Sequence, residues 1–299
     1  MNILLIGSSG QLGVEFLSID TVNQFNIQSP TSKELDITSK SDLQFFFNKL
    51  NPDIVLNFSA YTNVEKAETE PNKADNINNL GVNNLVELSN TFNSLLIHIS
   101  TDYVFGAEGE GPFDASSLTS PINQYGKSKD DGEKKIIKNS NNSIIIRTAS
   151  LYGLYGNNFF KKFISQLQKN KVINAISDHK ISITYSFDLA VFILNLILDY
   201  QNNVKNNLFI GVNILHIINN GFTSWFEVAK VIADELKKDD IESSIYKVNA
   251  ISSDNWTSVV TRPTDSRLQL SSIDHLADMP NWETSLRSAC KNFLTRGND

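Results

Sequence analysis

The sequence predicts an α/β fold in which a doubly wound parallel sheet carries helices on both faces. Three observations support this. Short aliphatic runs alternate with longer segments of helical spacing through the first half of the chain. The first of these runs leads directly into a glycine-rich turn. After about Tyr152 the alternation gives way to mainly helical segments, which indicates a smaller second lobe.

The elements follow from these patterns in chain order. Buried strands are expected at Ile3–Ile6, Asp53–Phe58, Leu95–Ser100 and Ser143–Arg147, with helices at Lys40–Lys49 and Ala74–Phe92. Later helices are expected at Phe159–Gln168, Phe187–Tyr200 and Trp225–Lys237. Ser224 is the expected N-cap of the last helix. Residues 1–150 should form the sheet domain and 151–299 mainly a second lobe, with some segments returning to the sheet.

Composition excludes several classes of protein. The chain has 299 residues and a net charge of −7. This charge argues against sequence-independent nucleic-acid binding, which needs a clustered basic surface. The longest apolar run, Leu189 to Leu198, is broken by Asn195 and is too short for a membrane span, so a cytoplasmic protein is expected. The single Cys290 should be buried in a C-terminal helix. The four scattered histidines predict no metal site.

The turn after the first strand has the residues of a dinucleotide-binding loop. It reads Gly7-Ser8-Ser9-Gly10-Gln11-Leu12-Gly13 and opens a helix. Glycines permit a tight turn and a close backbone approach, so free N–H groups can face a pyrophosphate. In this position, after a strand and before a helix, the loop predicts a Rossmann-type domain over residues 1–150.

The end of the second strand indicates which dinucleotide is bound. NAD sites usually place an acidic residue there to hold the ribose 2′-hydroxyl. Residues 25–33 contain no carboxylate, whereas their hydroxyls and Lys33 are suited to a 2′-phosphate. We therefore expect NADPH as the cofactor. NADH remains an alternative, and any single one of these residues could be part of a polar strand end with no role in cofactor binding.

A Tyr-x-x-x-Lys pair, Tyr125 and Lys129, is the expected catalytic core. Four residues apart on a helix, the two side chains share one face. A phenol near pKa 10 exchanges protons poorly at neutral pH, and a neighbouring ammonium should lower its pKa by stabilising the phenolate. Thr101, at the end of the strand Leu95–Ser100, is the expected hydrogen-bond donor to a substrate carbonyl. A Ser/Thr/Asp cluster that only caps a turn is the alternative.

With these motifs in place, the chain resembles the dTDP-4-dehydrorhamnose reductase family of the extended short-chain dehydrogenase/reductase superfamily. The resemblance runs from end to end. Its most specific parts are Asn57–Glu68, which contains Ser59-Ala60-Tyr61-Thr62, and Ile99–Phe105, which contains Ser100-Thr101-Asp102-Tyr103. Further parts are Leu35–Thr38, Pro121–Lys129, Gly156–Phe159, Asn220–Trp225 and Arg262-Pro263.

The resemblance implies a role for each matching residue. Asp36 and Ile37 would lie by the adenine, and Ala60 and Tyr61 would line the pyrophosphate–ribose path. Thr101, Tyr125 and Lys129 would form a catalytic triad that reduces the C4 keto group of a nucleotide-activated 4-keto-6-deoxy-sugar. The substrate contacts would be Asp102, Tyr103, Asn158 and Arg262. A homodimer is suggested by the resemblance alone.

Several segments depart from the family pattern. Tyr103 stands where the related 4,6-dehydratases carry a glutamate, which favours simple reduction over elimination. Ser150 stands where the rhamnose reductases usually have tryptophan, and residues 177–184 and 111–117 also differ. These departures all lie on the expected substrate side. His179, within residues 177–184, is expected to be a solvated loop residue.

Two alternatives therefore remain beside the leading interpretation. A related reductase would use a UDP-linked keto sugar in an altered pocket. A non-catalytic NADP-binding regulatory subunit would share the fold, although an intact Thr101, Tyr125 and Lys129 argues against it.

Overall fold

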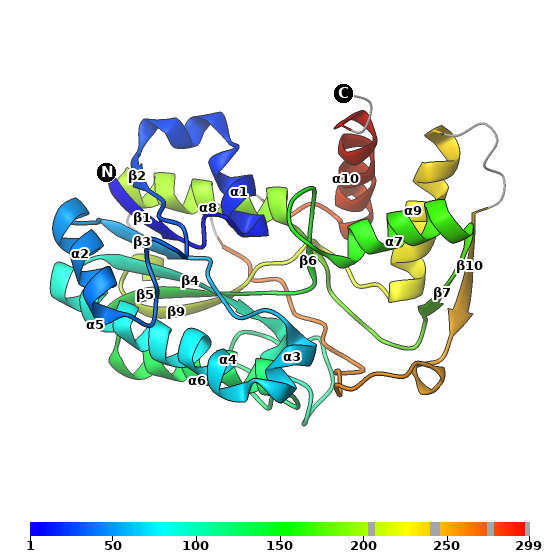
Figure 1. Cartoon of the computed structure of the whole chain (residues 1–299), viewed down its shortest axis with the longest axis horizontal. Coiled ribbons are helices and arrows are strands. Elements are labelled where there is room, and N and C mark those ends of the chain that lie inside the picture. Colours follow the sequence, from blue (N-terminus) through cyan, green and yellow to red (C-terminus); the bar gives the residue numbers. More distant parts are fainter. Residues whose placement is uncertain (203–206, 240–245, 274–277, 297–299) are drawn as a thin grey trace.

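A parallel sheet forms the centre of the larger lobe (Figure 1). The computed structural model describes residues 1–202, 207–239, 246–273 and 278–296. Within them the sheet has the order β2-β1-β3-β4-β5-β9, and each neighbouring pair is parallel. Its strands are β1 (Asn2–Ile6), β2 (Asn26–Gln28), β3 (Ile54–Asn57), β4 (Leu95–Thr101), β5 (Asn142–Thr148) and β9 (Gly211–His216). The strand order reverses between β1 and β3, and ligands of open α/β sheets bind beyond the strand ends at such a point.

Helices cover both faces of this sheet, as Figure 1 shows. Helices α1 (Gln11–Leu17) and α8 (Ser186–Gln201) pack on one face. Helices α2 (Lys40–Leu50), α5 (Gly81–Phe92) and α6 (Gln124–Asn139) pack on the other. The short helices α3 (Val64–Thr69) and α4 (Pro71–Asp75) lie beside α6. The predicted doubly wound, Rossmann-type fold is therefore confirmed.

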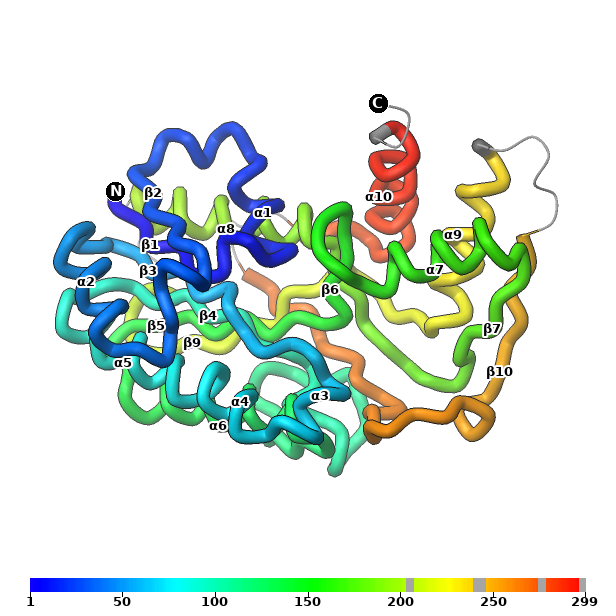
Figure 2. The backbone as a smooth tube through the Cα atoms, viewed as in Figure 1, coloured from blue at the N-terminus to red at the C-terminus, as the bar shows by residue number. Residues whose placement is uncertain are grey.

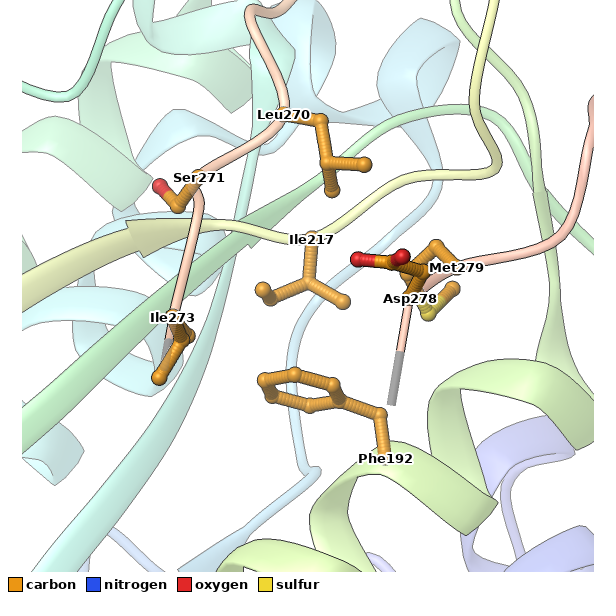
Figure 3. Close-up of a pocket in the computed structure, with 7 residues that line it drawn as sticks. All are labelled: Phe192, Ile217, Leu270, Ser271, Ile273, Asp278 and Met279. Carbon is orange, nitrogen blue, oxygen red and sulfur yellow. The ribbon is translucent and has the colours of Figure 1, made fainter. Parts of the chain in front are cut away.

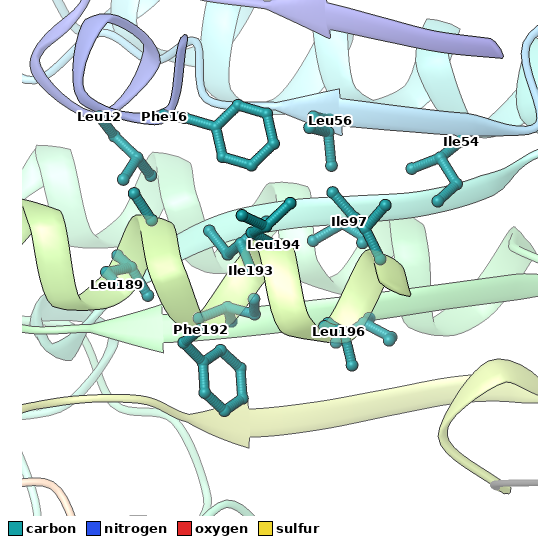
Figure 4. Packing of buried hydrophobic residues seen from close by; sticks show 14 of the residues in the cluster. Leu12, Phe16, Ile54, Leu56, Ile97, Leu189, Phe192, Ile193, Leu194 and Leu196 are labelled. Atoms are coloured by element: carbon teal, nitrogen blue, oxygen red, sulfur yellow. The ribbon is translucent and has the colours of Figure 1, made fainter. Parts of the chain in front are cut away.

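Successive side chains of each strand point to opposite faces of the sheet, so the core has one part on each face. Leu56 and Ile97 belong to the cluster that contains Phe16 of α1 and Leu189 of α8 (Figure 4). Val55 and Leu96, one position earlier on each strand, pack with α2 and α5 instead. Burying one such side chain stabilises the fold by about 1.5–3 kcal/mol. The aliphatic runs of the sequence are apolar throughout because both faces of each strand are buried.

The predicted helix over residues 74–92 is interrupted. A π-helical turn, Asn76–Leu80, separates α4 from α5. The wide turn brings its backbone close to α6, since a Cβ at Gly132 would lie 2.1 Å from the carbonyl oxygen of Asn78. The sequence prediction of one regular helix was wrong here, because contact with a distant helix decides the turn.

The smaller lobe lies beside one end of the sheet (Figure 2). It contains a further hydrophobic cluster. It is built from β6 (Leu151–Tyr152), α7 (Phe159–Asn170), β7 (Val172–Ile176), β8 (Thr184–Tyr185), α9 (Trp225–Asp239), β10 (Lys247–Ile251) and α10 (Trp282–Arg296). Strands β7 and β10 pair in parallel, as do β6 and β8. Short 3-10 turns occur at Asp20–Gln24, Asp102–Val104, Asn207–Phe209 and Ser253–Asn255.

Several local predictions for the second half can be compared with these elements. Ser224 caps α9 through Glu227 N at 3.2 Å, as predicted. Cys290 lies in α10 and is buried, also as predicted. Helix α8 and strand β9 come from the second half of the chain but belong to the larger lobe. In the described parts of the chain, no helix combines the length and apolarity that a membrane span requires.

Candidate active site

The glycine loop joins β1 to α1 at the switch point. Gly7 has a φ of 88°, and a Cβ there would lie 2.6 Å from the carbonyl carbon of Phe58, just beyond β3. A Cβ at Gly13 would lie 2.4 Å from the carbonyl oxygen of Gly7. These approaches explain why both positions need glycine. Ser8 Oγ donates to the Ser29 carbonyl at 3.1 Å, so the loop is also tied to the end of β2.

Asn158 supports this loop from the smaller lobe. Its Nδ2 donates to Gln11 Oε1 at 2.6 Å and to the Gly153 carbonyl at 3.0 Å. Its Oδ1 accepts from Lys161 N and caps α7. The structure thus places Asn158, a substrate contact by resemblance, against the glycine loop, with the amide engaged inside the protein.

The chain beyond β2 is exposed and presents hydroxyls and an amine. Ser29, Thr31 and Lys33 are all exposed there. Glu34, the next carboxylate, is turned back onto Thr31, whose N and Oγ1 each donate to it at 2.8 Å. Asp36 accepts from Thr38 N and Oγ1, also at 2.8 Å.

Two further residues of the expected cofactor path are held by α5 and by the π-helical turn. Ile37 is buried, and a Cβ at Gly81 would lie 2.9 Å from its Cγ2. Tyr61 N donates to Asn78 Oδ1 at 2.8 Å, and Asn78 Nδ2 donates to Ser128 Oγ at 2.9 Å. Asn78 therefore links the segment after β3, which also contains Ala60, to α6. No pattern in the sequence points to this role, because the link depends on the irregular turn.

The phenol of Tyr61 points to a carboxylate. It donates to Glu70 Oε2 at 3.0 Å. Burial and the hydrogen bond to Glu70 raise the pKa of Tyr61 above its ordinary value. The phenol hydrogen of Tyr61 is therefore engaged by Glu70 inside the protein.

Thr101 and Tyr125 meet at the end of β4. Thr101 Oγ1 donates its hydrogen to Asp102 Oδ1 at 2.9 Å and accepts from Tyr103 N at 3.2 Å. The Thr101 hydroxyl also lies close enough to Tyr125 to influence the pKa of its phenol. These three side chains, Tyr125, Thr101 and Asp102, form the group that we call the donor chain.

The electrostatic prediction for Tyr125 is wrong for this structure. Burial, with smaller contributions from Asp102 and Tyr103, raises the pKa of Tyr125 well above its ordinary value instead of lowering it. The physical reason lies in Lys129, whose amine is turned toward the strand. Its Nζ donates to the Ile99 carbonyl at 2.7 Å, and burial lowers its own pKa to about 8.

Asp102, Tyr103 and Arg262 lie beside the donor chain. Asp102 is buried, and its pKa is raised to about 6 by desolvation. The Tyr103 ring stands edge-on to that of Tyr125, with 5.8 Å between centroids. Arg262 pairs with Glu65 Oε1 at 3.2 Å, and its charge opposes the rise that burial causes in the pKa of Tyr103. The segment after β10 is thereby brought against α3, next to the donor chain.

The departing segments show two unusual features. Ser150 adopts a left-handed conformation with a φ of 41°, which a non-glycine residue rarely does. His179 is only 8% exposed, and burial lowers its pKa. The prediction of a solvated His179 was therefore wrong, because the smaller lobe covers the loop that carries it.

A small cavity lies away from these residues, between α8 and the chain after β9 (Figure 3). Its volume of about 20 Å³ has room for one water. It is lined by Phe192, Ile217, Leu270, Ser271, Ile273, Asp278 and Met279.

The described residues include no cluster of three or more His, Cys, Asp or Glu that could hold a metal ion.

Comparison with known proteins gives this site a family context. The chain matches the family described as RmlD substrate binding domain over residues 1–295. It is 30% identical to the dTDP-4-dehydrorhamnose reductase of Salmonella typhimurium, over 99% of each chain.

Solved structures give the same result. A dTDP-4-dehydrorhamnose reductase of Bacillus anthracis, crystallised with NADP, is 32% identical with a TM-score of 0.86 and covers 97% of this chain and 98% of its own. A dTDP-4-dehydrorhamnose reductase of Clostridium acetobutylicum is 28% identical with a TM-score of 0.87. The match covers 98% of this chain and 100% of that one. The fold, the glycine loop and the full-length matches agree, and the chain belongs to the RmlD substrate binding domain family.

Proposed function

We propose that the protein is an NADP-dependent oxidoreductase that reduces the 4-keto group of a nucleotide-activated 4-keto-6-deoxy-sugar, as a dTDP-4-dehydrorhamnose reductase does. The observation that carries the proposal is the Tyr125–Thr101–Asp102 donor chain at the end of β4, with Lys129 one helical turn beyond Tyr125. A protonated phenol at the carboxyl edge of a parallel sheet is placed to give a proton to a substrate bound there.

The residues present fit NADP. At Gly7 and Gly13, backbone atoms occupy the space that a Cβ would need. The loop is therefore as tight as only glycines permit, and its backbone N–H groups are free of side chains that would keep a pyrophosphate away. The exposed Ser29, Thr31 and Lys33 would hold the 2′-phosphate, and Tyr61 and Ala60 would line the path between the phosphates and the ribose. We assign residues 1–150 to cofactor binding, and 151–299 mainly to substrate binding.

When bound, NADPH supplies the hydride that reduces the C4 carbon. The protein supplies the matching proton. The phenol of Tyr125 turns from Thr101 to the C4 oxygen and gives up its hydrogen, which completes the alcohol. The protonated amine of Lys129 stabilises the phenolate left on Tyr125. Asp102 holds the hydrogen of Thr101 and Tyr103 N occupies one of its lone pairs, so the other lone pair would orient the phenol.

Substrate recognition is assigned to the edge where the two lobes meet. Arg262, which pairs with the exposed Glu65, is the cation that we assign to the diphosphate. Asp102 and Tyr103 would hold sugar hydroxyls. Asn158 would act on the substrate side through the glycine loop that it braces.

A UDP-linked keto sugar is the second candidate, and the observation that favours it is Ser150. Its side chain is small and its backbone left-handed, so it cannot offer a large planar surface to a sugar ring.

The test is NADPH oxidation, followed by its near-ultraviolet absorbance, with dTDP-linked and UDP-linked 4-keto-6-deoxy-sugars. We expect turnover of the dTDP sugar, and at least about a 100-fold loss in Tyr125→Phe, since a general acid is removed. Tyr200→Phe is the matched control, because Tyr200 packs on Phe209 at the far end of α8. Reduction of only the UDP sugar would select the second candidate. No reduction of either, with NADPH still bound, would favour a regulatory subunit.

A further inference from the structure

A buried hydrogen-bond chain runs from β3 to Lys129. Asn57 Nδ2 lies 2.9 Å from His98 Nδ1, and His98 Nε2 lies 3.2 Å from Lys129 Nζ. Asn57 and His98 are fully buried, and Lys129 is 1% exposed. Asn57 and His98 lie opposite one another on neighbouring strands, β3 and β4.

The orientation of the Asn57 amide is fixed by its other end. Asn57 Oδ1 accepts from Ser59 N at 3.1 Å and from Ser59 Oγ at 2.7 Å. A backbone N–H can only donate, so it must face the oxygen of the amide. The NH₂ group of Asn57 therefore faces His98 and donates to Nδ1.

This bond selects the tautomer of His98. Burial and the nearby Lys129 lower the pKa of His98 well below its ordinary value, so the ring is neutral. A neutral imidazole has one N–H and one acceptor nitrogen. Because Nδ1 accepts from Asn57, the hydrogen is on Nε2, the nitrogen that faces Lys129.

An N–H that faces an amine opposes its protonation. An ammonium has three hydrogens and no lone pair, whereas a neutral amine can accept the Nε2–H of His98. We propose that Asn57 and His98 are positioning residues for Lys129: Asn57 fixes the tautomer of His98, and the Nε2–H of His98 holds the Lys129 amine in place while opposing its protonation. The same contacts, with the Ile99 carbonyl, hold the amine against β4 in this structure.

The other charged groups around Lys129 do not remove this effect. Glu133, one turn further along α6, favours the ammonium, but its carboxylate is held by Arg147 of β5. Tyr125 on the same helix is protonated. Asp102, beyond β4, is engaged by Thr101. On β3 and β4 the facing groups are Asn57, His98 and the Ile99 carbonyl, and that carbonyl accepts from either form of the amine.

The inference deepens the proposed function and rests on it where it concerns turnover. The reductase needs the ammonium, so we expect activity to fall on the alkaline side as Lys129 loses its proton. A change that reverses the tautomer of His98 should move this fall to higher pH.

Asn57→Asp makes that change with almost no change of shape. One carboxylate oxygen still accepts from Ser59, and the other now accepts from Nδ1–H of His98, which leaves Nε2 free to accept from the ammonium. We expect the alkaline midpoint of kcat/KM to rise by about one pH unit, a tenfold gain in the proton affinity of Lys129. An unchanged midpoint in a folded Asn57→Asp variant would overturn the proposal.

A double-mutant cycle with His98→Leu separates the tautomer from the added charge. If His98 transmits the effect, Asn57→Asp shifts the midpoint by less than half as much in the His98→Leu background. Equal shifts in both backgrounds would mean that the carboxylate charge acts alone, and the proposal would fail. Ser94→Ala is the matched control, since Ser94 Oγ donates to the Pro52 carbonyl and joins the same two strands at their amino ends.

A spectroscopic readout does not depend on turnover. Long-range ¹H–¹⁵N spectra of the ¹⁵N-histidine-labelled protein should show one buried histidine, absent from His98→Leu, in the Nε2–H form at neutral pH. The Nδ1–H form in the wild type would contradict the inference whatever the activity. If the histidine is in the Nε2–H form but no keto sugar is reduced, the result would support the Asn57–His98–Lys129 hydrogen-bond chain and count against the proposed function alone.

Discussion

The guanidinium of Arg147 on β5 holds both carboxylate oxygens of Glu133 on α6, with contacts of 2.7 to 3.1 Å and side-chain exposures of only 3% and 1%. Arg147 also lies over the Phe105 ring, 5.1 Å from its centroid. The pair fixes the helix that carries Tyr125 and Lys129 to the strand beside β4. The position of α6 thus depends on a charge pair removed from water.

Removing one partner of this pair should be costly. Glu133→Gln leaves the Arg147 charge buried without a counter-ion, and we expect the free energy of unfolding to fall by about 3–5 kcal/mol in urea titrations near neutral pH. The exposed pair Lys40–Glu87 is the matched control, and Glu87→Gln should cost less than about 1 kcal/mol. Similar losses in the two variants would show that burial of the first pair carries no energetic weight.

Asp102 should make the protein less stable as the pH rises from about 4 to 6. Desolvation raises the pKa of Asp102 from 3.8 to about 6, so the folded state holds a proton that the unfolded state has lost. Its stabilising contribution is complete below pH 3.8 and is lost by about pH 6, a change of at most roughly 3 kcal/mol. Asp102→Asn should therefore raise the free energy of unfolding at pH 8 by about 1–3 kcal/mol, with no gain at pH 4. A variant less stable than the wild type at pH 8 would refute this account.

His216 should act in the opposite direction over an overlapping range. It is fully buried, with Nδ1 3.0 Å from the Phe113 carbonyl, and burial and Arg147 lower its pKa from 6.5 to about 4. The unfolded state gains a proton first, so stability is complete above pH 6.5 and is lost as the pH falls toward 4. Between pH 7 and pH 4.5 the free energy of unfolding, measured in urea, should fall by roughly 2–3 kcal/mol less in His216→Gln than in the wild type. An equal fall in the two proteins would assign the loss of stability to other groups.

Gly13→Ala should weaken cofactor binding, because the backbone around this glycine leaves no room for a Cβ. The new Cβ would meet the Gly7 carbonyl at 2.4 Å, so the loop must open and its backbone must leave the pyrophosphate position. We expect NADPH affinity to fall at least about tenfold by calorimetric titration. Gly211→Ala, where a Cβ meets nothing within 4 Å, should lower stability through its positive φ and leave NADPH affinity unchanged.

The sequence predicted the features that depend on residues close together in the chain. Apolar runs such as Ile3–Ile6 gave strands because both faces of the sheet are buried. The glycine loop was recognisable because its geometry is set within seven residues. Tyr125 and Lys129 share a helix face because four residues make about one turn. Thr101 was placed correctly at the strand end, since a strand and the turn after it are also local.

Contacts between distant parts of the chain were decided only by the tertiary structure. His98 lies in a strand that the sequence presented as aliphatic, and only the pairing of β3 with β4 brings it to Asn57. The turn at Asn76–Leu80 is wide because α6 packs closely against it. Asn158 meets Gln11 across 147 positions. The charge state of a buried group depends on which neighbours replace water around it, and those neighbours are supplied by the topology of the fold, not by the spacing of residues along the chain.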